Sequence, residues 1–357
     1  MRRALPLLAL GLTLLAAPAG AQAPQVPAAE PAPAEPLSVE PLSVEPPLLT
    51  APAGREPVET NGFRDTTLAA PPPVGAEADP DADLAYGAFQ RGYYLTAFHR
   101  ATQRLERLPD DAAAMTLLGE LYAQGLGVPQ DVARAADWYR LAARRGDPNA
   151  LFALAMIAIE GEGVPADPRE GRALLERAAE AGHPRAAYNL ALLLLGSEEE
   201  ADLARAAELM RLAAEADVAP AQHALGVLYA EGRALEEDPI AAAAWFSRAA
   251  RSGDVAGMVE YAIALFNGAG LAANEEEAAR WFREAAFRGN AVAQNRLARL
   301  HAQGRGVAQD PVEAAAWHLA AASQGLDDAW LDEALARLTP DERADALALA
   351  ESRLSQP

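Results

Sequence analysis

The sequence predicts an all-α protein, a solenoid in which antiparallel helix pairs are stacked one after another. One set of landmark residues recurs along the chain at a spacing of about 36 residues. Four of the six copies also carry a Gly-x-Gly helix end, and all six have an acidic or amide helix start at the same place, with apolar residues at helical spacing. Self-similarity at one fixed period of this length is typical of a solenoid, whose units pack against their neighbours.

Six copies make up residues 114–328. Counted from the first residue of a copy, Leu stands at +4 (Tyr261 in the fifth copy), a small residue at +5, Gly near +11, Asp or Asn at +17, Trp or a substitute at +24 and Gly near +32 (Asp217 in the third copy). The third copy has lost one residue from its loop. The predicted repeats are 114–149, 150–185, 186–220, 221–256, 257–292 and 293–328.

The N-terminus has the three parts of a secretory signal peptide. Two arginines precede an apolar run, and the tripeptide Ala-Gly-Ala at 19–21 precedes Gln22. Residues 1–21 are therefore predicted to be a signal peptide that is cleaved after Ala21. The apolar run is too short to span a bilayer comfortably, so we expect that the mature protein is not inserted in the membrane.

Residues 22–82 are predicted to be a disordered linker. They are rich in Pro, Ala and Glu and contain the pentapeptide PLSVE twice in tandem, at 36–40 and 41–45. With few aromatic residues and frequent prolines, this segment cannot bury enough apolar surface to offset the entropy of the chain.

The charge balance argues against two classes of partner. The chain has 51 acidic and 30 basic residues, and every basic residue is arginine. An acidic protein is repelled by nucleic acid and by anionic lipid surfaces, so neither is an expected partner. The chain also has no cysteine, which excludes disulfides and means that packing alone must hold the fold together.

Two shorter units flank the six copies. Residues 83–113 resemble part of a tetratricopeptide repeat, with a short helix expected around Leu84 to Gln90. Residues 329–357 are predicted to be a C-terminal helical cap, which an open-ended stack requires. Thr339 and Glu342 form a capping box before the last helix, whose leucines, Leu347 among them, are expected to be buried.

Each copy contains the signals of two helices. The first helix, from Ala114 to Ala123 in copy one, ends in a Gly-x-Gly loop, where glycine permits the positive φ that closes a helix. The second helix begins at the +17 residue, whose side chain accepts hydrogen bonds from the first turn. In the six copies these residues are Asp131, Asp167, Asp202, Asp238, Asn274 and Asp310. The second helix of copy three should end at Asp217, a residue that tolerates the left-handed conformation.

The combined landmarks resemble Sel1-like repeats, the slightly longer relatives of tetratricopeptide repeats. Copy one shows them together as L-G-x-x-Y, G-x-G-V, Asp, W-Y-x-x-A-A and G-D. Copies two and three depart from the pattern, with Leu174-Leu175 and Leu209-Met210 in place of Trp-Tyr. The resemblance implies a right-handed superhelix of antiparallel helix pairs. It also implies an adaptor or regulator that holds protein partners, in bacteria often in the cell envelope.

Motifs for catalysis are missing from the sequence. Without Lys and Cys the chain can form no phosphate-binding Gly-Lys-Ser/Thr loop and no thiol site, and its five histidines lack metal-ligand spacing. His301 and His318 replace core aromatic residues of other copies, so we expect both to be structural. The sequence predicts no catalytic, cofactor or metal site, and hence a protein that is not an enzyme. The alternative is a cell-wall or β-lactam hydrolase, because some secreted Sel1-like relatives are linked to β-lactamase-type activity.

Candidate partner-binding residues lie on the first helices, which line the concave surface of tetratricopeptide-like stacks. Positions +2, +6 and +9 should point inward, and in the middle copies they are apolar. The candidates are Phe152, Met156, Ile159, Tyr188, Leu192, Val227, Val259, Ile263 and Phe266. The last copy is polar there, with Asn295 and Arg299. Either the superhelix covers these apolar side chains itself, or they form a groove for a partner.

Two further patterns bear on function. Acidic triplets at 198–200, 236–238 and 275–277 occupy the same loop of consecutive copies and could form an acidic rim, or they could simply favour the helix dipole. The tryptophans at +24 recur at a constant offset, which predicts packing between repeats rather than a ligand site.

These observations together predict an exported scaffold that binds a protein or peptide in the bacterial periplasm. Its specific role would be regulation of an envelope signalling or assembly complex. The sequence does not identify the partner.

Overall fold

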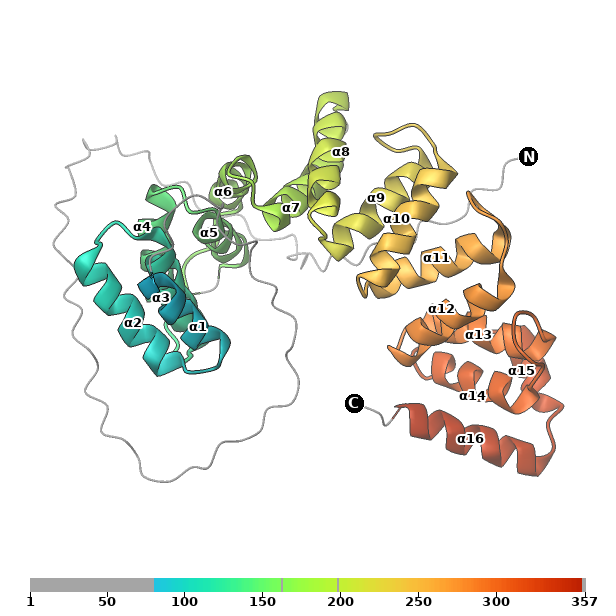
Figure 1. Cartoon of the computed structure of the whole chain (residues 1–357). Coiled ribbons are helices and arrows are strands. Elements are labelled where there is room, and N and C mark those ends of the chain that lie inside the picture. Colours follow the sequence, from blue (N-terminus) through green and yellow to red (C-terminus); the bar gives the residue numbers. More distant parts are fainter. Residues whose placement is uncertain (1–79, 162, 198, 355–357) are drawn as a thin grey trace, which may run out of the picture. The chain divides into compact units, whose positions relative to one another are not determined.

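The computed structural model describes the backbone of residues 80–161, 163–197 and 199–354. This part of the chain folds into sixteen α-helices and contains no strand (Figure 1). The predicted signal peptide, and the predicted linker as far as residue 79, lie outside the described residues. The helices are α1 Pro80–Gln90, α2 Tyr94–Arg107, α3 Ala112–Gln124, α4 Val132–Arg144, α5 Pro148–Glu160, α6 Pro168–Glu180, α7 Pro184–Leu195, α8 Glu200–Glu215, α9 Ala219–Glu231, α10 Pro239–Arg251, α11 Val255–Asn267, α12 Glu275–Phe287, α13 Ala291–Gln303, α14 Pro311–Ala322, α15 Ala329–Ala336 and α16 Pro340–Leu354.

The helices form consecutive antiparallel pairs, which confirms the predicted all-α solenoid. Within each copy a first helix packs on a second helix, as α5 does on α6, and the second helix packs on the first helix of the next copy. Helix α1 begins at Pro80, three residues before residue 83, the predicted start of the folded part of the chain. Among the described residues, no helix is both long and apolar enough to cross a bilayer.

Side-chain caps start most of the helices, as the sequence predicts. Asp131, Asp167, Asp238, Asn274 and Asp310 each accept a hydrogen bond from a backbone N–H in the first turn of the following second helix.

The prediction for copy three is wrong at this point. Asp202 lies inside α8, which begins at Glu200, and the N-cap residue Glu199 makes no side-chain capping bond. In the shortened loop, Ser197 Oγ accepts a hydrogen bond from Glu199 N at 3.2 Å, just before the helix begins. The other unusual prediction for this copy is confirmed, since Asp217 closes α8 with a φ of 59°.

The second glycine of the Gly-x-Gly loop has a role beyond its positive φ. A Cβ atom on Gly306 would lie 2.1 Å from the carbonyl oxygen of Glu275, the first residue of the preceding second helix. A Cβ atom on Gly270 would lie 1.9 Å from the carbonyl oxygen of Pro239 in the same way. Each loop therefore rests directly on the backbone of the preceding repeat, at a distance that only glycine allows.

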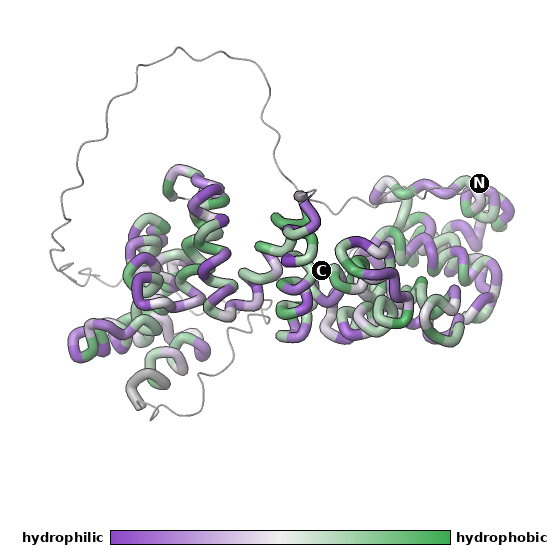
Figure 2. The backbone as a smooth tube through the Cα atoms, turned by 90° about the horizontal axis from the view of Figure 1, so that it is seen from above, coloured by the Kyte–Doolittle hydropathy of each residue, from purple (hydrophilic) through white to green (hydrophobic). Residues whose placement is uncertain are grey.

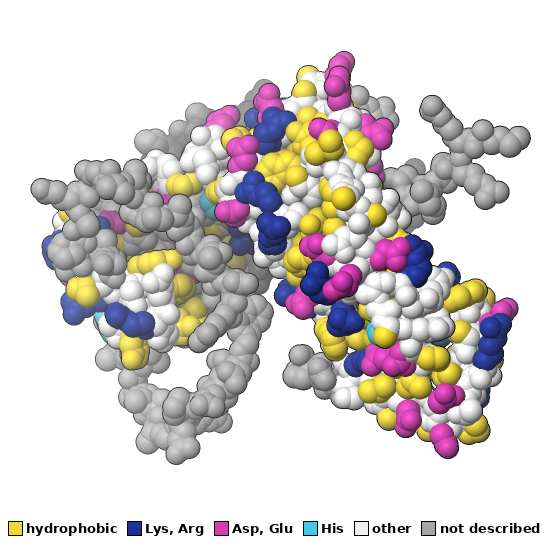
Figure 3. Space-filling view, turned by 45° about the vertical axis from the view of Figure 1, so that its right-hand side comes forward, with side chains coloured by type: hydrophobic (Ala, Val, Ile, Leu, Met, Phe, Trp, Pro, Cys, Tyr) yellow, Lys and Arg dark blue, Asp and Glu magenta, His cyan; other side chains and the backbone are white. Residues whose placement is uncertain are grey.

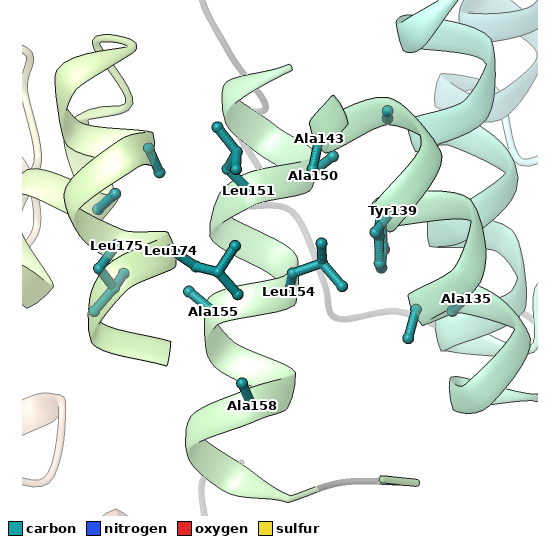
Figure 4. Packing of buried hydrophobic residues seen from close by; sticks show 14 of the residues in the cluster. Ala135, Tyr139, Ala143, Ala150, Leu151, Leu154, Ala155, Ala158, Leu174 and Leu175 are labelled. Atoms are coloured by element: carbon teal, nitrogen blue, oxygen red, sulfur yellow. The ribbon is translucent and has the colours of Figure 1, made fainter. Parts of the chain in front are cut away.

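The core runs along the seams between successive helices. In Figure 4, Leu151, Leu154 and Ala155 of α5 lie between Tyr139 of α4 and Leu175 of α6. The small residue at +5 makes room for the large side chain of the paired helix. Gly119 shows this most clearly, because a Cβ atom there would lie 2.5 Å from Cε1 of Tyr139. Figure 2 shows hydrophilic and hydrophobic stretches alternating along the helical part of the chain, as expected for helices with one buried and one exposed side.

The tryptophans at +24 pack against the core to different degrees. Trp138 and Trp317 are buried, as the constant offset predicts. Trp245 and Trp281 are only half-buried, and the guanidinium carbon of Arg248 lies 4.6 Å from the ring centroid of Trp245. The position is therefore part core and part surface, depending on the repeat.

The C-terminal cap is built as predicted at its start but not along its length. Thr339 N donates to Glu342 Oε2 at 2.9 Å and Glu342 N donates to Thr339 Oγ1 at 3.3 Å, which confirms the capping box. The expected burial of Leu347 and Leu349 is wrong, since these side chains are 47% and 36% exposed. Ala346 and Ala350 are buried instead, because small residues let α16 lie close against α14.

Candidate protein-binding face

The nine candidate residues lie on four first helices, α5, α7, α9 and α11. We call this set the first-helix face. Eight of the nine side chains are half-buried in the described structure, and Val259 is buried at 6% exposure. The face is thus neither a fully covered core nor a freely solvated surface. Figure 3 shows one side of the molecule, on which hydrophobic side chains gather in patches between arginine and acidic side chains.

Polar side chains of α7 and of its N-cap residue partly cover the start of the face. The ring of His183 stacks on Phe152 with centroids 4.5 Å apart, and the Arg185 guanidinium carbon lies 5.7 Å from the Phe152 centroid. The amide of Asn189 lies within reach of Met156, with Nδ2 donating to Sδ at 3.9 Å. These contacts leave part of each apolar side chain open.

His183 also has a structural role that explains its electrostatics. Its Nδ1 accepts a hydrogen bond from Ala186 N at 3.1 Å and so caps α7. Burial, together with the positive charge of Arg185, lowers the pKa of His183 to about 4. The ring is therefore neutral at pH 7, which keeps the capping nitrogen free to accept.

Near the middle of the face, a carboxylate lies close to two aromatic side chains. Burial raises the pKa of Tyr188, and the negative charge of Asp254 adds to this effect. Burial lowers the pKa of His223, while Asp254 opposes that shift. Asp254 is itself the N-cap of α11, accepting from Gly257 N at 2.6 Å. Its position is thus explained by helix capping.

Ile159 lies at the edge of the face rather than in its centre. Its Cγ1 atom lies 2.5 Å from the place where a Cβ atom of Gly171 would be. The side chain therefore packs against α6 of its own repeat, where it helps to close the helix pair.

The far end of the face opens into a pocket between α11 and α13. Its volume is about 310 Å³. Two of the candidate residues, Ile263 and Phe266, form part of its wall. The remaining lining residues are Asn267, Phe282, Arg296, Arg299, Leu300, Gln303 and Arg305.

Two of the pocket arginines are held by carboxylates. Arg299 makes a bidentate pair with Asp328, donating from Nε to Oδ2 at 2.7 Å and from a terminal nitrogen to Oδ1 at 2.8 Å. Asn295 Nδ2 donates to the same carboxylate at 2.8 Å. Burial of Asp328 works against its charge, but the bonds from Arg299 and Asn295 prevail and lower its pKa to about 2.

Arg305 is held from two sides. Its Nε donates to Glu275 Oε1 at 3.2 Å, and its guanidinium carbon lies 4.2 Å from the centroid of Phe266. The hydrogen bond and the opposite charges of the Arg305–Glu275 pair raise the pKa of Arg305 and lower that of Glu275. One member of the proposed acidic rim is therefore engaged in an ion pair between repeats.

The rest of the acidic rim falls at helix starts. Glu199 and Glu200 begin α8, Glu236 and Glu237 precede α10, and Glu276 and Glu277 lie in the first turn of α12. Glu198 lies outside the described residues. Acidic side chains at these positions interact favourably with the helix dipole, which accounts for most of the pattern.

Sequence reasoning found the apolar part of the pocket and missed its polar part. Arg296, Arg299 and Arg305 belong to the last copy, whose polar character set it apart from the predicted groove. In the structure these residues meet Ile263 and Phe266 of the preceding copy. The position of Arg299 could have indicated that it belongs to the same face, since Arg299 stands at +6, as Met156 and Ile263 do in their copies.

Within the described residues, no group of three or more His, Asp or Glu side chains is placed to hold a metal ion. His301 and His318 are buried, as expected for substitutes of core aromatics. His318 Nε2 lies 2.7 Å from Asp332 Oδ1, a contact between α14 and α15.

The family of the chain follows from its repeats. The Sel1 repeat model matches residues 112–147, 148–183, 184–218, 219–254, 255–290 and 291–326. The chain belongs to the Sel1 repeat family. Each matched Sel1 repeat begins two residues before the copy delimited from the sequence, so that it starts with the first helix or close to it.

Solved structures with Sel1 repeats are similar to the chain. A Sel1 repeat protein from Oxalobacter formigenes is 24% identical, with a TM-score of 0.58, over 68% of this chain and 96% of that chain. A protective antigen of uropathogenic Escherichia coli with an SLR fold is 26% identical, with a TM-score of 0.48, over 77% of this chain and 68% of that chain. No curated protein sequence matches the chain. Sel1 repeats generally bind protein partners and form scaffolds that are typically non-catalytic.

Proposed function

We propose that this Sel1 repeat protein is an exported scaffold that binds a peptide segment of a partner protein on its first-helix face. The observation that carries the proposal is the row of half-buried apolar side chains along α5, α7, α9 and α11. Apolar groups that remain partly open next to one another are typical of interaction sites. An amphipathic segment laid in such a groove would bury them.

We further propose that the protein acts in the periplasm as a regulator of an envelope signalling or assembly complex. The support is the sequence of residues 1–21, which has the form of a secretory signal. The mature protein should then begin at Gln22 and be recovered in the soluble periplasmic fraction, which N-terminal sequencing after fractionation would check. An intact N-terminus in the membrane pellet would contradict export. The hydrolase alternative has no support from any arrangement of side chains described above.

The binding proposal is tested in two steps. A photo-crosslinking amino acid at Leu192, on the first-helix face, should capture a partner in the native cell that the same group at Leu212 does not capture. Leu212 is a matched control because it is 58% exposed on the second helix α8. The captured protein is then purified and its affinity measured directly.

Met156→Glu and Ile263→Glu should each weaken that affinity by at least about tenfold, because each replaces an apolar contact with the partner by a carboxylate that the partner would have to desolvate. The thermal midpoint of both variants should stay close to that of the wild type, since both side chains are half-buried. Leu212→Glu should change neither quantity. Unfolding of Met156→Glu or Ile263→Glu would assign the face to the core and end the proposal.

A further inference from the structure

The pocket between α11 and α13 combines an apolar wall with cationic side chains. Ile263 and Phe266 are half-buried, and Leu300 behind them is buried. Arg296, Arg299 and Arg305 complete the lining. In a chain with 51 acidic and 30 basic residues, three arginines around one pocket make a local exception to the charge of the protein.

The three arginines differ in how far their charge is already balanced. Arg299 is paired with Asp328, and Arg305 with Glu275. Arg296 is exposed and makes no hydrogen bond or ion pair with any residue that the structure describes. The lining therefore holds three guanidinium groups against two paired carboxylates, and one positive charge remains for a ligand.

The volume of the pocket limits what it can hold. At about 310 Å³ it lies at the lower end of the roughly 300–1,000 Å³ typical of small-molecule pockets. It is large enough for a bulky apolar side chain with a neighbouring group. The first-helix face also includes Val259 on α11 and Val227 on α9, a helix that contacts α11. A ligand that uses this whole surface must extend beyond the pocket instead of ending there.

We propose that the pocket recognises an internal acidic residue of the partner peptide together with an adjacent bulky apolar residue. The apolar side chain packs against Ile263 and Phe266, and the Asp or Glu carboxylate pairs with Arg296. This inference rests on the proposed function, since it names the chemistry of the segment that the first-helix face binds. The unbalanced guanidinium sets the charge that the face accepts at this end, which gives specificity more than affinity.

The probe is a library of random 12-residue peptides displayed internally in a carrier protein and selected against the full chain. Selection on the wild type should enrich Asp or Glu beside Leu, Ile, Met or Phe. Selection on Arg296→Glu should enrich Lys or Arg at the acidic position. Arg100→Glu is the matched control, because Arg100 is exposed on α2 and the charge change is the same. It should select the same peptides as the wild type.

One enriched peptide is then synthesised with the acidic residue kept, changed to its amide, or changed to Lys. Arg296→Glu should weaken the acidic peptide by about tenfold and should regain that loss with the Lys peptide. Its thermal midpoint should match the wild type, because Arg296 is exposed and unpaired. Amidation of the peptide C-terminus should leave the affinity unchanged.

The outcomes separate this inference from the proposed function. Peptides that lose affinity with Ile263→Glu and Met156→Glu but not with Arg296→Glu would keep the face and overturn the role of the pocket. Loss of binding when only the C-terminus of the peptide is amidated would overturn recognition of an internal carboxylate. Failure to enrich any peptide, or enrichment without regard to charge, would also overturn the inference. Enriched peptides whose binding ignores Met156 and Ile263 would count against the proposed function itself.

Discussion

Helices α5 and α13 hold the same place in the second and sixth repeats, and they differ in a systematic way. Leu154 and Leu297 stand at the same position and are both buried. Two residues further along, Met156 of α5 stands at the position that Arg299 occupies in α13. In the same way, Phe152 corresponds to Asn295. The positions that build the fold are thus shared. Positions +2 and +6, which we call the outward positions because their side chains are only half-buried, carry apolar groups in one helix and an ion-pair network in the other.

This difference separates stability from specificity within one repeat. A position that meets the same neighbours in every repeat has little freedom to change. An outward position has no such constraint and can be adapted to what it binds. Residues that determine function should therefore be sought at equivalent positions that carry different residue types in different repeats.

The largest expected effect concerns the shared position. Leu154→Ala and Leu297→Ala should each lower the free energy of unfolding by about 2–5 kcal/mol, because both empty a buried site. Leu212→Ala, on the exposed side of α8, should change it by less than about 0.5 kcal/mol. Urea unfolding of the three variants measures this. A cost confined to one of the two helices would show that the repeats are not equivalent in their cores.

The outward position should give unequal results in the two helices. Arg299→Leu leaves the buried Asp328 carboxylate without its main partner and should cost about 1–3 kcal/mol. Met156→Leu conserves volume at the corresponding position and should cost less than about 1.5 kcal/mol.

The pH dependence of stability shows whether charge explains the effect of Arg299→Leu. The pKa of Asp328 is lowered from 3.8 to about 2, so its charge stabilises the fold above pH 3.8 and this contribution is lost as the pH falls toward 2. The difference between wild type and Arg299→Leu should therefore shrink in that window. A difference that stays constant down to pH 2 would mean that lost packing, and not charge, explains the variant.

The smallest effect should come from substitution of His183, which caps α7 and stacks on Phe152 of α5. Asn290 caps α13 as His183 caps α7, so His183→Asn should change stability at pH 7.5 by no more than a few tenths of a kcal/mol. The folded wild type holds a neutral imidazole with a pKa of about 4 in place of 6.5. The contribution of the neutral His183 to stability is therefore complete above pH 6.5, and it is lost as the pH falls to about 4.

His183→Asn should lose this part of the pH dependence. Thermal midpoints at pH 7.5 and pH 4.5 would measure it, with the fall between the two pH values expected to be larger for the wild type. Parallel curves for the two proteins would show that His183 does not titrate differently on folding.

The sequence was sufficient for the architecture because its signals are local. A capping residue such as Asp131 or Asn274 acts on the turn that follows it, and a loop glycine acts on its own φ. Such signals failed where several candidates compete within a few residues. The segment before α8 offers acidic residues at consecutive positions, and the helix begins at Glu200 although Asp202 matches the period.

Contacts between elements were harder to predict. Leu347 is more apolar than Ala346, but the side chains facing α16 on α14 include Ala315 and Ala316, so alanine allows the closer packing. The pocket posed the same difficulty, because Phe266 and Arg299 belong to different repeats. Their meeting depends on how far α11 and α13 stand apart, and no spacing within a single copy records that distance.

The contact of each loop glycine with the preceding repeat limits how the array can change in length. Gly306 lies against the first residue of α12, Glu275, and Gly270 lies against the first residue of α10, Pro239. Removal of residues 255–290 would bring Gly306 to the carbonyl of Pro239, the contact that Gly270 makes at present. Removal of half a repeat would place a helix where the loop must lie. Recombination can therefore remove the repeat of residues 255–290, and with it the surface that the repeat carries, without redesigning the junction that Gly306 forms.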